Sequence, residues 1–131
     1  MKFQSYFLRI AIFSYLFLFI SSNTFAAPVY STSYDLSGQD GAPANLIFND
    51  DGTRMYMTGR LVNLTMEYSL TTGFDVTDVN FLRTFDQSGE EPVPSGITFN
   101  NDGTKFYVIG LGGGSIFEYD LSPAYDRMQQ F

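Results

Sequence analysis

The side chains of this chain that could do chemistry are carboxylates, because its 131 residues include no Cys and no His. Cys and His supply the usual activated nucleophile, the usual general base and the commonest transition-metal ligand. Without Cys the chain also forms no disulfide and no thiolate metal site. Carboxylates remain as ligands for hard cations or as acid–base pairs. The composition therefore argues against most hydrolases and metalloenzymes, and we predict no catalytic residue, no metal site and no cofactor.

Two sets of carboxylates recur along the chain. Asn49-Asp50-Asp51-Gly52 and Asn100-Asn101-Asp102-Gly103 have the composition of calcium loops, but they lack the Glu and the spaced oxygen ligands of an EF-hand. We interpret both as structural turns. Glu67 and Glu118 each precede a Tyr in a predicted strand, where a Glu is typical of a sheet edge or an ion pair. In separate repeats they lie too far apart for the paired-carboxylate chemistry of glycosidases.

These patterns recur because the chain contains an internal repeat. A shift of 51 residues aligns Tyr30–Asn80 with Phe81–Phe131 without a gap, and 15 of the 51 positions are identical. A period near 50 residues is in the range of propeller blades and other repeat arrays. We therefore divide the chain into a leader, residues 1–26, and a region 27–131 that consists of units 30–80 and 81–131.

Short strand-like runs fill each unit, and no segment beyond the leader has helical periodicity. The predicted strands are Leu46–Phe48, Arg54–Thr58, Leu64–Ser69 and Val79–Phe85 in the first unit, and Ile97–Phe99, Lys105–Ile109 and Ser115–Asp120 in the second. Asp-Gly between the first two runs is a strong hairpin signal, so we expect Gly52 and Gly103 to have positive φ. Tyr30–Tyr34 is the counterpart of the fourth run and is predicted to be a strand as well. The fold class is all-β.

The repeats resemble a known class of protein. Asn49–Gly59 and Asn100–Gly110 are similar to the SPDGTKLYVTG core of YVTN-type and lactonase-like bacterial β-propellers, and Glu67–Val76 is similar to their YDLSTPFDVST segment. The resemblance covers nearly all of residues 28–126 and implies β-propeller-type blades, here two four-stranded antiparallel repeats of an incomplete propeller. A blade is apolar on both faces, which agrees with the run Met55-Tyr56-Met57. The resemblance implies a blade architecture and no particular chemistry.

The chain holds two units, whereas propellers have about four to eight blades. If the four strands of a blade are lettered A to D in chain order, the strands of this chain run D, then A-B-C-D, then A-B-C. Two explanations stay open. Several copies form a homo-oligomer by head-to-tail strand exchange, each lending its first strand to a neighbour's open blade. Alternatively the chain is a truncated relic of a longer propeller, which the unmatched tail Arg127–Phe131 favours.

Propellers usually bind ligands on the face shared by the D–A and B–C connections. These connections are Ser37–Asn45, Ser88–Gly96, Gly59–Asn63 and Gly110–Gly114. The candidate binding residues within them are Asp40, Arg60, Glu90 and Glu91. We predict a non-enzymatic binding or interaction module for an unknown ligand or protein. The alternatives are a truncated lactonase-like hydrolase and a non-functional fragment of a longer propeller.

The leader is typical of a secretory signal. Lys2 and Arg9 form its basic region, and Ile10–Ile20 is an apolar run shorter than the roughly 20 residues that span a bilayer. We expect a secreted or periplasmic protein with no membrane attachment after cleavage. Cleavage of the leader removes Lys2 and Arg9 and leaves a mature chain with a net charge of about −9, which makes nucleic acid a poor partner.

We predict cleavage between Ala26 and Ala27, because Thr24-Phe25-Ala26 places small residues at the two positions that signal peptidase reads. The intact mass of the protein recovered from the exported fraction should match residues 27–131. Recovery of a species that retains residues 1–26 would contradict the assignment.

Overall fold

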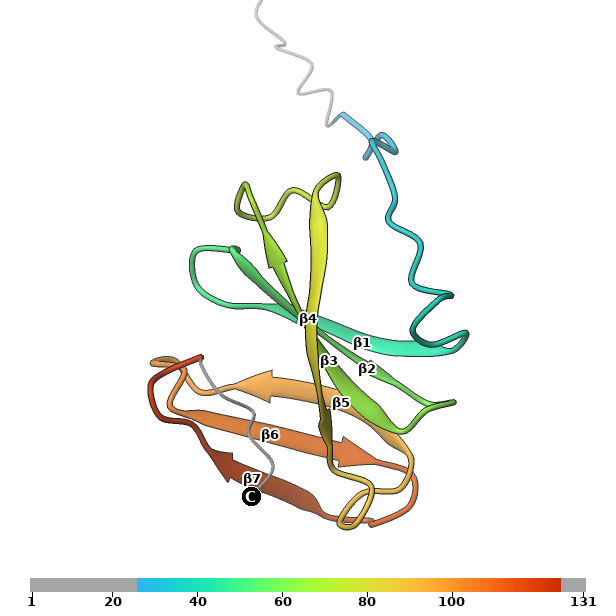
Figure 1. Cartoon of the computed structure of the whole chain (residues 1–131), viewed down its shortest axis with the longest axis vertical. Helices are drawn as coiled ribbons and strands as arrows, with labels where there is room; N and C mark the ends of the chain where they lie inside the picture. The colour runs from blue at the N-terminus through green and yellow to red at the C-terminus, as the bar shows by residue number, and fades with distance from the viewer. Residues whose placement is uncertain (1–25, 126–131) are drawn as a thin grey trace, which may run out of the picture. The chain divides into compact units, whose positions relative to one another are not determined.

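Every regular element in residues 26–125, the part that the computed structural model describes, is a β-strand. The strands are β1 (Pro43–Phe48), β2 (Arg54–Gly59), β3 (Leu64–Leu70), β4 (Val79–Asp86), β5 (Pro94–Phe99), β6 (Lys105–Gly110) and β7 (Ile116–Asp120). β1-β2-β3-β4 form the first sheet and β5-β6-β7 the second, both antiparallel (Figure 1). The prediction of an all-β fold of antiparallel strands is confirmed. Within this range no helix is long and apolar enough to cross a membrane.

The chain divides into two parts, residues 1–30 and residues 31–131. Residues 26–30 are exposed and belong to no strand. Both sheets lie in the second part. The rest of the predicted leader and the tail Arg127–Phe131 lie outside the described residues.

The two repeats pair their equivalent strands in the same register. In the second sheet Pro94 lies opposite Gly110, and the register shifts before Gly96, which lies opposite Ile109. β1 and β2 pair with the same register and the same shift 51 residues earlier, and the β6–β7 pairing likewise repeats the β2–β3 pairing. β1 and β5 begin at a proline, earlier than predicted, because the first residue of a strand tolerates the missing N–H.

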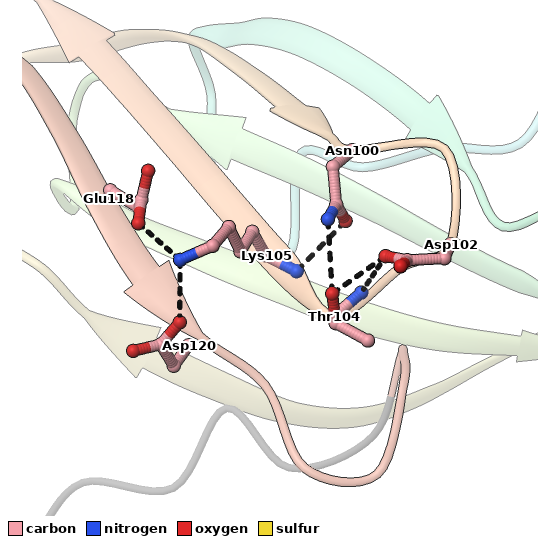
Figure 2. A network of polar contacts seen from close by, with 6 residues as sticks. All are labelled: Asn100, Asp102, Thr104, Lys105, Glu118 and Asp120. Carbon is pink, nitrogen blue, oxygen red and sulfur yellow. Dashed lines mark hydrogen bonds and ion pairs between the residues drawn. The ribbon is translucent and has the colours of Figure 1, made fainter.

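Matching side chains build the first hairpin turn of both sheets. In the second sheet Asn100 accepts a hydrogen bond from the Lys105 backbone at 2.9 Å, and Asp102 accepts one from the Thr104 hydroxyl at 2.6 Å (Figure 2). The first sheet has both bonds at the same lengths. The Thr104 hydroxyl and backbone N–H hold the pKa of Asp102 below its ordinary value. The interpretation of the acidic segments as structural turns is confirmed.

Each face of the first sheet contributes to a hydrophobic cluster, as the run of three apolar residues in β2 predicts. Tyr56 belongs to an inter-sheet cluster, whose buried members are Tyr56, Phe85, Ile97, Phe106, Val108 and Leu121. Its neighbours in the strand belong to a Met-rich cluster, whose buried members are Met55, Met57, Met66, Tyr68, Leu70 and Val79. Because successive strand residues point to opposite faces, one strand feeds both clusters.

The prediction of a strand at Tyr30–Tyr34 is wrong for the single chain. These residues belong to no strand, and both sheets form without them. A strand requires a continuous ladder of backbone hydrogen bonds with a neighbouring strand. Pairing beside β3 is closed, since β2 and β4 occupy both of its edges. The second sheet accordingly has three described strands. Tyr34 nevertheless packs edge-on against Tyr68, with ring centroids 6.4 Å apart.

Both turn glycines have the predicted positive φ, 71° at Gly52 and 67° at Gly103. A side chain at Gly52 is strained for a second reason: a Cβ would lie 2.4 Å from the Phe74 ring and 2.6 Å from the Phe74 backbone nitrogen. Gly38 offers a matched control, because a Cβ there meets no atom within 4 Å and its φ is outside the left-handed region.

We predict that Gly52→Val lowers the free energy of unfolding by about 1–3 kcal/mol, through φ strain and the contact with Phe74. Gly38→Val, measured by the same urea titration, should change it by less than about 0.5 kcal/mol. Equal effects of the two substitutions would contradict the turn assignment.

Candidate binding face

The loops predicted to form a binding face lie at corresponding ends of the two sheets. Asp86, the last residue of β4, pairs with Leu64 just after the β2–β3 loop, and Pro94, the first residue of β5, pairs with Gly110 just before the β6–β7 loop. The connection 87–93 therefore runs from one loop to the other (Figure 1). We call the β2–β3 loop, the β6–β7 loop and the segments 36–42 and 87–93 the loop face.

Asp40 is a buried brace within this face. Its side chain is 2% exposed and accepts hydrogen bonds from the backbone N–H groups of Ala42, Leu61 and Val62 at 2.5, 3.0 and 2.9 Å. These bonds satisfy backbone donors that a loop would otherwise leave to water. Asp40 therefore ties segment 36–42 to the β2–β3 loop.

Glu91 is the equivalent brace in the second unit. Fully buried, it accepts hydrogen bonds from the backbone N–H groups of Val93, Gly112 and Gly113 at 2.9, 2.8 and 2.8 Å. Burial raises the pKa of Glu91, but the three N–H donors outweigh that effect, so the pKa lies below its ordinary value. The Gly112 position leaves room for the longer acid, since a Cβ there would lie 3.0 Å from a Glu91 oxygen.

The other two predicted residues, Arg60 and Glu90, are exposed. Around them the loop face carries large aliphatic side chains: Leu61 is 68% exposed, Val62 40% and Leu111 74%. Sequence reasoning did not single out these three residues, although they belong to the predicted connections. It also missed the bracing role of Asp40 and Glu91, for which the only signal is an acid at the same position of each repeat.

Charged side chains on neighbouring strands form ion pairs. Glu67, 2% exposed, lies 3.5 Å from Arg54 and 2.5 Å from Arg83 on neighbouring strands. In the second sheet Lys105 contacts Glu118 and lies 2.8 Å from Asp120 (Figure 2). The ion-pair interpretation of Glu67 and Glu118 is thus confirmed. In residues 26–125 no group of three or more acidic side chains is arranged to hold a metal ion.

Comparison with protein families, curated proteins and solved structures gives no match. Function must therefore be inferred from the chain's own residues. The two buried acids of the loop face already accept backbone hydrogen bonds, and the exposed groups are aliphatic or singly charged. Such a surface is suited to non-covalent contact, with Arg60 and Glu90 as polar groups beside the aliphatic side chains.

We predict that acid destabilises the fold partly through Glu91. Its pKa is lower in the folded chain than its ordinary value of 4.5, so the unfolded state takes up a proton first as the pH falls. The stabilisation is present above that ordinary value and is lost as the pH falls through the folded pKa. The urea midpoint should therefore decline between about pH 6 and pH 3.

Glu91→Gln should flatten this decline. Urea titrations of the two proteins across the same pH range make the comparison. A Glu91→Gln protein with the slope of the unsubstituted protein would argue against the brace.

Proposed function

We propose that this chain is an exported, non-enzymatic β-propeller-type module that binds another protein through its loop face. The propeller-type assignment is supported by the resemblance of Asn49–Gly59 and Asn100–Gly110 to propeller repeats and by the identical register of the two sheets. It is also supported by the stacking of the second sheet against one face of the first. The location, secreted or periplasmic, follows from the leader.

The observation that carries the proposal is the combination of hydrogen-bonded loops and exposed aliphatic side chains. Asp40 accepts hydrogen bonds from the backbone of Leu61 and Val62, so this part of the loop backbone is already ordered before any partner binds. A preorganised surface loses less conformational entropy on binding than a flexible loop. Exposed aliphatic side chains gathered in braced loops are typical of protein-interaction sites.

The charge distribution favours a protein partner. The expected net charge of about −9 opposes nucleic acid and anionic membranes. Arg60 and Glu90 place one charge of each sign beside the aliphatic residues, an arrangement typical of the polar rim of a protein interface. A hydrolase would instead need an unengaged acid–base group, and the buried carboxylates Asp40, Glu67 and Glu91 are all bonded within the chain.

The test is site-specific photo-crosslinking in the producing cells. A photoreactive side chain at Leu61 should cross-link to a second, different polypeptide, which mass spectrometry identifies. The same group at Leu82, which is 42% exposed on β4 and away from the loop face, is the matched control and should give no such product. No cross-link from Leu61, or cross-links only between copies of this chain, would overturn the proposal. Hydrolysis of a lactone panel by the purified protein would favour the lactonase-like alternative.

A further inference from the structure

A row of polar side chains crosses the first sheet on the face that packs against the second sheet. Asn45 of β1 lies opposite Thr58 of β2, and Thr58 lies opposite Thr65 of β3. Strand alternation places Thr58 on the same face as Tyr56, which belongs to the inter-sheet cluster. Thr58 and Thr65 are fully buried. The row therefore brings polar groups into the interior beside an apolar cluster.

The buried polar atoms of this row have no hydrogen-bond partner within the part of the chain that the structure describes. They are the hydroxyls of Thr58 and Thr65 and the side-chain oxygen of Asn45. A buried hydroxyl without a partner loses the hydrogen bonds that it makes to water in the unfolded chain. Nearly all buried polar groups in proteins are bonded, directly or through an ordered water. The row therefore indicates a bound molecule.

Gln87, the first residue of the connection 87–93, adds a hydrogen-bond donor to the row. Its side-chain oxygen accepts a hydrogen bond from the Thr65 backbone N–H at 3.2 Å. Because that N–H requires an acceptor, the bond fixes which end of the Gln87 amide is the oxygen. The amide nitrogen of this fully buried side chain has no partner among residues 26–125. Two hydroxyls and one N–H₂ group thus gather around Thr65.

These three groups define the chemistry of the molecule that fits them. The amide N–H₂ group only donates, which disfavours a cation, whereas the hydroxyls both donate and accept. Side chains directly opposite each other on neighbouring strands have Cβ atoms about 4.5–5.5 Å apart, a span that one water oxygen can bridge. A buried water typically makes about three hydrogen bonds. Thr58, Thr65 and Gln87 offer that number of partners.

We infer that this site binds an ordered water molecule, which accepts a hydrogen bond from the Gln87 amide and bridges the hydroxyls of Thr58 and Thr65. The water joins the connection 87–93 to β2 and β3, in addition to the direct bond between Gln87 and Thr65. It is a structural ligand of the fold, held beside the inter-sheet cluster. The inference does not depend on the partner proposed for the loop face.

Asn45 connects the row to the molecular surface. It lines an open groove of about 470 Å³, whose walls also include Gly96 and Ile109. Its side-chain oxygen, the third buried acceptor of the row, lies on the strand next to Thr58. The groove gives the bound water a route for exchange with solvent.

The equivalent row of the second sheet carries no polar side chain. The residues 51 positions after Thr58 and Thr65 are Ile109 and Ile116, which also lie opposite each other. They are 49% and 73% exposed, so this row buries no hydroxyl that needs a partner. The water site therefore occurs once in the two repeats, on the face where the sheets meet.

Replacement of each threonine by valine tests whether the hydroxyls are hydrated. Thr58→Val and Thr65→Val should each lower the urea midpoint, because each removes a hydrogen bond to the water. Together they should lower it by less than the sum, because the hydroxyls share one water. Thr84→Val, at an exposed position of β4, is the matched control and should change the midpoint little. If the hydroxyls are dry, removing an unsatisfied buried group raises the midpoint, and that result overturns the inference.

Oxygen-17 magnetic relaxation dispersion of the exported protein detects the water directly. A water held in the fold for longer than the protein takes to tumble adds a dispersion to the relaxation of the solvent. The unsubstituted protein should show such a dispersion, and the double variant Thr58→Val/Thr65→Val should lose the contribution of one molecule. Circular dichroism shows whether the variant has retained its strands. No dispersion in the unsubstituted protein, or equal dispersions in the two folded proteins, would show that the site holds no water.

Discussion

The covering of both faces of the first sheet is the constraint on which the rest of this structure depends. Tyr56 enters one hydrophobic cluster, while Met55 and Met57 enter the other. A sheet with a hydrophobic cluster on each side cannot expose either cluster to water without losing the burial that stabilises it. The second sheet covers one face, and Tyr34 and Leu36 pack against the cluster on the other.

Stacking of the two sheets brings distant segments together. Since equivalent strands have the same register, the connection from β4 to β5 brings the loops of both units to corresponding ends of the sheets. There Asp40 and Glu91 satisfy backbone donors that lie up to 22 residues away. The same carboxyl chemistry thus serves as a brace at two equivalent positions, and the aliphatic side chains of the loops are left at the surface.

Equivalent residues of the two repeats have different ion-pair partners where one is buried and the other is exposed. Glu67 is buried and has two arginine partners, whereas Glu118 is exposed and shares one lysine with Asp120. This difference follows from the sheets' positions: a buried carboxylate needs compensation from several donors, and an exposed one is hydrated by water.

The sequence by itself determined the strands, the repeat and the turns. Asp-Gly turns, strand alternation and a 51-residue period depend on residues close in the chain or on direct comparison of its two halves, so Gly52 and Gly103 were predicted with their conformation. Only the tertiary structure decided that Asp40 and Glu91 are buried, because their donors in the β2–β3 and β6–β7 loops lie 21 and 22 residues away. It also decided that Tyr30–Tyr34 is no strand in the single chain, because a strand exists only beside a partner that can share its hydrogen bonds.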